Sequence, residues 1–223
     1  IGGAALNQEI ESFLKDIDFP FTVGYGATEC APIITYSDWH DFVPMSCGRE
    51  VVHMEVKIDS ENPETVPGEI LARGLNVMLG YYKNDEATAQ TIDKDGWYHT
   101  GDLGLMDKGG NVFIKGRSKN MLLGPNGQNI YPEEIEDKLN SMTFAMESVV
   151  VQRDGKLVGL VHPDFDEVQA MGLSRDDLQS LMEENRVQVN ANLPVYCKIA
   201  AIEIHDEEFE KTPKKSIKRY LYK

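Results

Sequence analysis

Two short motifs contain charged side chains that could bind a ligand together. Asp102 lies in the glycine-flanked run Tyr98–Leu103, which reads as a turn. Arg117 follows 15 positions later, after a strand-like run and a glycine. A carboxylate and a guanidinium presented together suit a ribose or a phosphate group. Each motif alone is also typical of a plain turn or a solvated hairpin, but their order and spacing after a third motif, Gly24–Glu29, favour a nucleotide site.

Composition narrows the class of protein. The 223 residues are enough for one large domain or two small ones. A formal net charge of −15 argues against a general nucleic-acid binder, which needs a basic surface. Three cysteines without metal-ligand spacing indicate a reducing compartment, so we expect a cytoplasmic protein. No apolar run has the length of a membrane span, and the opening at Ile1 is typical of the middle of a longer protein.

The first half of the chain reads as a helix followed by short strands. Asn7 is a plausible N-cap for a helix over residues 7–17, whose apolar residues recur at helical spacing. A strand over 21–23 then leads into Gly24–Glu29, and glycines after a strand are common at nucleotide sites. From residue 47 to 116 we expect a small, mostly antiparallel β subdomain. Its predicted elements are strands at 51–58, 69–73 and 112–114 and a helix at 84–92.

The second half has the pattern of a separate, compact α+β domain. Its predicted elements are a hairpin around residues 124–127, a helix from Pro132 to Ser141, a hairpin at 149–161, a helix at 174–192, a strand at 199–204 and a closing helix at 217–221. The fold class is therefore α/β and α+β. Residues 1–116 form the end of a large α/β domain with its small β subdomain, and residues 117–223 form the C-terminal domain.

Taken together, the motifs resemble those of the adenylate-forming superfamily, which includes acyl-CoA synthetases, luciferases and the adenylation domains of peptide synthetases. Within it they look most like the C-terminal portion of bacterial long-chain fatty-acid–CoA ligases. The similarity extends over nearly the whole chain. The motifs that carry it are Gly2–Ala4, Gly24–Glu29, Gly68–Gly74, Gly80–Tyr82, Tyr98–Leu103, Gly116–Lys119 and Gly127–Glu136.

The resemblance implies an AMP-forming acid–thiol ligase that uses ATP, Mg²⁺ and coenzyme A. Such an enzyme makes an acyl adenylate and then transfers the acyl group to coenzyme A. Three alternatives stay open: a carrier-protein acceptor, a catalytically degenerate relative, and a module that only binds or docks. The implied partners are small molecules rather than nucleic acid. The full-length protein could touch a membrane peripherally because its substrate would be a lipid, and the oligomeric state is unknown.

The resemblance also implies roles for residues of the first domain. Tyr25 would stack on adenine between Gly24 and Gly26. Thr28 would contact phosphate, and Glu29 would help to hold Mg²⁺. Asp102 would accept hydrogen bonds from both ribose hydroxyls, and Arg117 would also reach the ribose. The acyl and adenine pocket would be lined by Gly2, Gly3 and Ala4.

Several of these roles have simpler alternatives. Glu29 alone could be a helix-start carboxylate, and Tyr25 could be a core aromatic. Lys119 would be the hinge about which the C-terminal domain rotates, or a plain solvated lysine. Gly127 would belong to the loop on the coenzyme A side. The histidines are read as structural, with His99 as a candidate exception because it adjoins the ribose motif.

Two departures from the family pattern bear on activity. The glycine- and serine-rich phosphate loop is absent, so we expect the chain to be part of a longer protein and inactive in adenylation alone. The family lysine register, four residues after Thr212, is occupied by Ser216. Lys215 is our candidate for its role of neutralising the carboxylate and polyphosphate. Lys214 is a weaker candidate, and the whole cluster could instead be a solvated basic tail.

Overall fold

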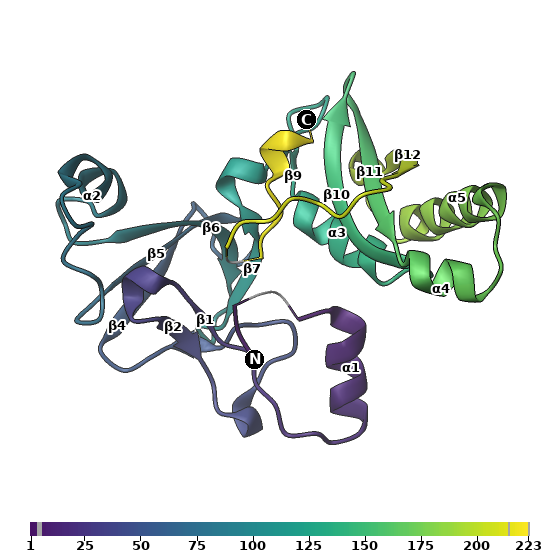
Figure 1. Cartoon of the computed structure of the whole chain (residues 1–223). Coiled ribbons are helices and arrows are strands. Elements are labelled where there is room, and N and C mark those ends of the chain that lie inside the picture. The colour runs from purple at the N-terminus through teal and green to yellow at the C-terminus, as the bar shows by residue number, and fades with distance from the viewer. Residues whose placement is uncertain (4–5, 214, 223) are drawn as a thin grey trace. The chain divides into compact units, whose positions relative to one another are not determined.

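The computed structural model describes residues 1–3, 6–213 and 215–222 (Figure 1). The chain divides into two compact units, Ile1–Lys119 and Asn120–Lys223. The sequence placed this division between residues 116 and 117, three positions earlier. Because Ala4 and Lys214 lie outside the described residues, their predicted roles have no structural counterpart here.

The first unit is built on a four-stranded antiparallel sheet (Figure 1). Side chains alternate between buried and exposed along its first strand, as expected where one sheet face packs on a core. The sheet lies within the region where the sequence predicted a small β subdomain. Its strands, in spatial order, are β4 (Met54–Asp59), β5 (Gly68–Gly74), β6 (Tyr98–Met106) and β7 (Val112–Arg117).

A smaller three-stranded sheet packs on the first. It contains β1 (Tyr25–Gly26), β2 (Ile33–Tyr36) and β3 (Arg49–Glu50), joined in antiparallel order. One buried cluster links the two sheets. Its members are Tyr25, Cys30, Ile34, Met54, Val56, Ile58, Ile70, Ala72, Tyr98 and Val112. The predicted strand at 21–23 is wrong, because pairing with β2 begins only at Tyr25.

Side-chain caps begin both α-helices of this unit. The Asn7 carboxamide accepts the backbone N–H groups of residues 9 and 10 at the start of α1 (Gln8–Asp16). Asn84 does the same for residue 87 at the start of α2 (Asp85–Thr91). Both predicted helices are confirmed to within two residues. The apolar stripe of α1 remains exposed in this chain, at Ile10, Phe13 and Ile17.

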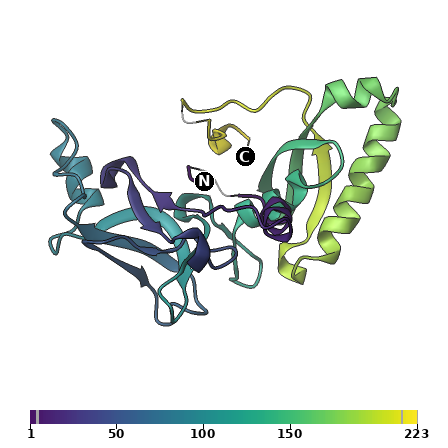
Figure 2. The ribbon, with the colours of Figure 1, turned by 90° about the horizontal axis from the view of Figure 1, so that it is seen from below.

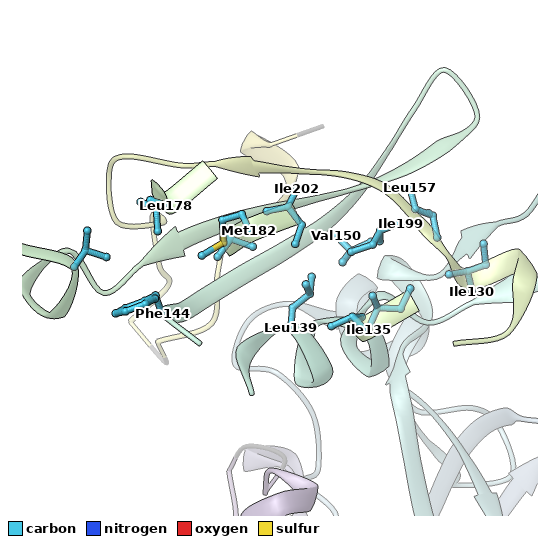
Figure 3. Packing of buried hydrophobic residues seen from close by; sticks show 13 residues of the cluster. Ile130, Ile135, Leu139, Phe144, Val150, Leu157, Leu178, Met182, Ile199 and Ile202 are labelled. Atoms are coloured by element: carbon cyan, nitrogen blue, oxygen red, sulfur yellow. The ribbon is translucent and has the colours of Figure 1, made fainter. Parts of the chain in front are cut away.

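The second unit contains a three-stranded sheet with helices on one face. Strand β10 (Ala145–Arg153) pairs antiparallel with β11 (Lys156–Pro163), which pairs parallel with β12 (Ile199–Ile204). Helix α3 (Pro132–Asn140) packs on β10 and α5 (Arg175–Ala191) packs on β12, and the two helices touch. Figure 2 shows α5 running along the sheet, and Figure 3 shows the buried side chains between them.

The remaining segments of this unit are short. Helix α4 (Phe165–Ala170), which the sequence did not predict, precedes α5, and β8 (Leu122–Leu123) pairs with β9 (Asn129–Ile130). On the sheet face away from α3, Phe209 is buried against side chains of β10 and β11. The predicted closing helix at 217–221 is wrong, since only a 3₁₀ turn, Arg219–Leu221, forms there. Across residues 1–3, 6–213 and 215–222, no helix is long and apolar enough to cross a membrane.

Candidate functional site

Asp102 lies in a bulge of β6, rather than in the turn that the sequence suggested. Glu69 of β5 pairs with Leu103, whereas Leu71 pairs with His99, so residues 100–102 all face one residue of β5. A bulge bends the strand and re-aims its side chains. Gly101 is at the centre with φ +71°, a conformation that L-residues rarely adopt. The glycine beside Asp102 is therefore explained by the bulge itself.

The bulge directs the Asp102 carboxylate into a buried polar contact. The Tyr25 hydroxyl donates to Oδ2 at 2.6 Å, and the Arg117 Nε lies 2.8 Å from Oδ1. Arg117 stands opposite Asp102 in the β6–β7 pairing, and its Nη1 also donates to the Thr100 carbonyl at 3.1 Å. Asp102 is only 9% exposed. The structure thus brings together Tyr25, Asp102 and Arg117 from three strands.

Tyr25 has a structural role as well as its predicted binding role. Its side chain is buried in the cluster between the two sheets. Burial, followed by the neighbouring Asp102 carboxylate, raises the pKa of the Tyr25 hydroxyl. The hydroxyl therefore stays protonated and donates to Asp102. Stacking of the ring on adenine stays a prediction.

The two glycines around Tyr25 are needed by the backbone. A Cβ on Gly26 would lie 2.1 Å from the Pro32 carbonyl oxygen, and one on Gly24 would lie 3.3 Å from the Thr35 carbonyl oxygen. Gly24 also donates its N–H to the Ile1 carbonyl at 2.9 Å. Gly2 lies beside this contact, since a Cβ on Gly2 would lie 3.2 Å from the Gly24 carbonyl oxygen. The predicted pocket residues Gly2 and Gly24 are therefore neighbours.

Glu29 is held by a tyrosine from another part of the first unit. It lies with the exposed Thr28 in the 3₁₀ turn Thr28–Cys30. The Tyr81 hydroxyl donates to Glu29 Oε1 at 2.9 Å. Burial raises the pKa of the nearby Tyr98 hydroxyl, and the Glu29 carboxylate raises it further. The carboxylate of Glu29 is thus oriented before any ligand binds.

A magnesium site built only from protein groups is not found in the described part of the chain, where no three acidic, histidine or cysteine side chains cluster. Mg²⁺ is commonly held by one or two carboxylates together with substrate phosphates. One oriented carboxylate, Glu29, fits that pattern when a polyphosphate supplies the other ligands.

The predicted residues near the unit boundary lie on exposed turns. Lys119 is exposed in the 3₁₀ turn Ser118–Asn120 and is the last residue of the first unit. Gly127 is at the end of the β8–β9 hairpin with φ +80°, and its N–H donates to the Gly124 carbonyl at 2.9 Å. Their hinge and coenzyme A roles stay predictions.

Lys215 and Ser216 are exposed at the end of a hairpin near the C-terminus. Thr212 N–H donates to the Ser216 carbonyl at 2.8 Å, and Lys215 N–H donates to the Thr212 carbonyl at 2.8 Å. Lys215 has φ +61°, so the hairpin turns sharply at that residue. The described contacts favour neither residue as the catalytic group.

Two ion pairs hold this hairpin and the turn after it against the rest of the second unit. The Arg219 guanidinium contacts both oxygens of Glu136 on α3, with Nη1–Oε1 at 2.6 Å. Glu136 is 6% exposed and also accepts the Val150 N–H at 2.6 Å. Burial raises the pKa of the Glu136 carboxyl, and Arg219 opposes that rise. On the other side, Lys211 Nζ lies 2.6 Å from Glu147 Oε1.

The sequence missed the residues that support the site. Tyr81, which holds Glu29, and Glu69, which contacts the bulge, both lie inside motifs that carry the family resemblance. Glu136 lies in such a motif too. Membership in these motifs was the signal that could have marked them. Their contacts were not predictable from the sequence because they join residues that are far apart in it.

Comparisons with known proteins identify the family of this chain. Residues 1–82 match the family model described as AMP-binding enzyme. The chain is 37% identical to a long-chain-fatty-acid–CoA ligase of Escherichia coli over 178 residues, covering 77% of this chain and 28% of that protein. It is 38% identical to 4-coumarate–CoA ligase 1 of Glycine max over 177 residues, covering 74% of this chain and 60% of that protein.

The chain belongs to the adenylate-forming, AMP-binding superfamily. It spans less than two thirds of the length of either of these relatives. Its fold is similar to that of O-succinylbenzoate coenzyme A synthetase (MenE) from Bacillus subtilis in complex with AMP. The TM-score is 0.78 at 24% identity, covering 100% of this chain and 44% of that one. The predicted fold class of this AMP-binding chain is therefore confirmed.

Proposed function

We propose that this AMP-binding chain is the C-terminal part of an ATP-dependent acid–thiol ligase, with the predicted division into the end of a large domain and a mobile C-terminal domain. The observation that carries the proposal is the Asp102 carboxylate, fixed between the Tyr25 hydroxyl and the Arg117 guanidinium in a member of this superfamily. A buried carboxylate with an exposed guanidinium beside it suits the two hydroxyls of a ribose.

The proposed reaction has two steps. First, an oxygen of the carboxylic acid attacks the α-phosphorus of ATP, a phosphorus–oxygen bond forms, and pyrophosphate leaves. Second, the thiol of coenzyme A loses its proton, its sulfur attacks the acyl carbon, and AMP leaves. Both steps need the nucleotide to be held in one orientation, because positioned reactants avoid most of the entropic cost of meeting.

The residues of the chain would divide this work. Asp102 and Arg117 would hold the ribose, Tyr25 would contact adenine, and Thr28 would contact phosphate. Glu29 would hold Mg²⁺, which neutralises phosphate charge when bound. The exposed Lys215 would neutralise the carboxylate and polyphosphate as they meet. Lys119 would be the hinge about which the C-terminal domain rotates between the two steps.

A long-chain fatty acid is the proposed acid. The name of the E. coli relative supports this choice, while the Glycine max relative is named for 4-coumarate, so relatives of similar identity differ in substrate. A cytoplasmic location remains part of the same proposal because the three cysteines favour a reducing compartment. Peripheral contact with a membrane is also part of it, because the substrate would be a lipid.

The test is AMP release by the full-length protein with ATP, Mg²⁺, coenzyme A and fatty acids of increasing length, with 4-coumarate as the comparison acid. We expect release that requires both a long-chain acid and coenzyme A. AMP release with 4-coumarate and with none of the fatty acids would refute the fatty-acid assignment. AMP release that requires the acid but not coenzyme A would point to a carrier-protein acceptor. No AMP release with any acid would refute the ligase.

A second candidate function is a degenerate relative that binds nucleotide without activating an acid. The serine at the family lysine register favours it, because a hydroxyl cannot neutralise phosphate charge as an ammonium does. Lys215→Ala and Ser216→Lys in the full-length protein separate the two. Adenylation lost in the first variant assigns the role to Lys215. Adenylation absent in the wild type and gained in the second variant establishes the degenerate relative.

A further inference from the structure

We propose that Glu69 is a positioning residue for the nucleotide ribose, acting by holding the β6 bulge that presents Asp102. The inference rests on the proposed function, since it assigns a supporting group to the same site. It is carried by the contacts of β5 with two of the three bulge residues, Thr100 and Gly101, and not by any contact of Glu69 with the ligand.

The Glu69 carboxylate bridges Gly101, at the centre of the bulge, and His99, the residue just before the bulge. Its Oε1 accepts the Gly101 N–H at 2.9 Å, and its Oε2 lies 2.9 Å from His99 Nδ1. The Gly101 N–H projects from the bulge, where the regular β5–β6 pairing is interrupted. A carboxylate acceptor makes a stronger bond than a neutral one, so Glu69 stabilises the backbone at the residue that turns the strand.

The two other bulge residues are tied to the same region. The Thr100 hydroxyl donates to the Ile70 carbonyl at 2.8 Å and accepts the Asp102 N–H at 3.0 Å. Consecutive residues of the bulge are thus fixed by neighbouring residues of β5. Since Asp102 follows Gly101 directly, a shift of the Gly101 peptide would move the carboxylate relative to Arg117.

His99 in turn orients Glu69. Its Nε2 lies 3.7 Å from Asp93 Oδ2, and Asp93 Oδ1 accepts the N–H groups of Asp95 and Trp97 at 2.9 Å each. The imidazole is therefore held between two carboxylates, one of which is fixed by a local turn. The sequence left His99 as a candidate exception among structural histidines, and these contacts give it a supporting role.

The bulge matters because ribose recognition is demanding in geometry. A side chain that meets two hydroxyls must be held to within about 0.5 Å of its productive position. The Glu69 side chain is 27% exposed, so its hydrogen bond to Gly101 is partly shielded from bulk water. Loss of this acceptor would loosen Asp102 without removing any group that touches the nucleotide.

The experiment uses three variants of the full-length protein. Glu69→Ala removes the acceptor. Glu69→Asp keeps the charge but is one methylene too short to meet both Gly101 and His99. Glu69→Gln can still accept from Gly101 and donate to a neutral His99 Nδ1. The control is Glu55→Ala, which breaks an exposed pair with Arg73 on the same sheet (2.7 Å).

Two measurements are made on each variant. Calorimetry compares ATP with 2′,3′-dideoxy-ATP, which lacks both hydroxyls that Asp102 would bind. Hydrogen exchange follows a peptide that contains residues 99–103 and reads the bulge directly, whether or not nucleotide binds. We expect the Ala and Asp variants to bind ATP about tenfold more weakly and the Gln and control variants to stay within about threefold.

For 2′,3′-dideoxy-ATP, we expect all variants to bind like the wild type. Equal losses with both nucleotides would overturn the inference, because they would indicate a general structural defect. Unchanged exchange at residues 99–103 in Glu69→Ala would also overturn it. If the wild type binds no ATP, the proposed function fails and the ribose role fails with it. Exchange would then still decide separately whether Glu69 holds the bulge.

Discussion

Replacing Arg219 by methionine should destabilise the second unit much more than an exposed ion pair would. Methionine keeps much of the length of the side chain but removes the charge that faces Glu136. That carboxylate is 6% exposed, and the Arg219 side chain is 20% exposed. Removing one partner of a buried pair costs about 3–5 kcal/mol because the other charge is left uncompensated. The partial exposure of Arg219 favours the lower end, about 3 kcal/mol.

The loss of stability in Arg219→Met should grow as pH rises. Burial raises the pKa of the Glu136 carboxyl, and without Arg219 nothing of comparable charge opposes that rise. Between the unfolded and the folded pKa, the native state of the variant binds more protons than its unfolded state. Its stability therefore falls as pH rises through this window. The difference from the wild type should be larger at pH 8 than at pH 5.

Hydrogen exchange of peptides from α3 and β10 is the suitable assay. Both tryptophans, Trp39 and Trp97, lie in the first unit, so tryptophan fluorescence does not report on the second. We expect faster exchange in the second unit and an unchanged fluorescence transition in the first. The matched control is Arg153→Met, which breaks a pair with Glu203 that is 41% and 49% exposed and should cost about 0–1 kcal/mol.

A second variant tests the cause. Adding Glu136→Gln to Arg219→Met removes the buried charge but keeps an acceptor for the Val150 N–H. The double variant should recover most of the lost stability and show little pH dependence. The reasoning is refuted if Arg219→Met exchanges no faster than Arg153→Met, or if the double variant is no more stable than the single one.

Three further predictions concern the first unit and the thiols. Asp102→Asn should weaken ATP binding about 10- to 100-fold in calorimetry, because the single carboxamide oxygen can accept from Tyr25 or from Arg117 but not from both; unchanged binding would remove Asp102 from the site. Gly101→Ala should lower the free energy of unfolding by about 1–2 kcal/mol in denaturant titration, because alanine is strained at φ +71°. A clash should add nothing, since the new Cβ would meet only Arg117 Nη1, at an ordinary 3.7 Å. Burial raises the pKa of all three cysteines to about 11, so at pH 8 they should alkylate on the order of 100-fold more slowly than a free thiol and speed up as pH rises; rapid alkylation at pH 8 would contradict this.

The sequence predicted those elements whose ends are marked by a few neighbouring residues. Asn7 and Asn84 mark helix starts by their capping chemistry, and the hairpin at residues 154–155 is marked by an Asp-Gly pair; all three appear in the structure. The closing helix failed because Arg219 is bound to Glu136, and the segment follows that contact instead of its helical pattern.

The site could be predicted only in part for a similar reason. The residue types and order of Tyr25, Asp102 and Arg117 indicated a nucleotide site, and the structure brings these three together. The bulge was not predictable, because residues 98–103 read as a turn until the pairing with β5 is known. Glu69 and Tyr81 act through contacts with residues more than 29 positions away, which no local pattern contains.

The parallel pairing of β11 and β12 has a consequence for how the second unit forms. Strands β10 and β11 are joined by a short hairpin, but β12 can pair only after the chain has passed through α4 and α5. Contacts between residues far apart in sequence form late, since the entropy of closing the loop must be lost first. The segment with Lys215 follows β12, so we expect it to be among the last parts of the second unit to settle into place.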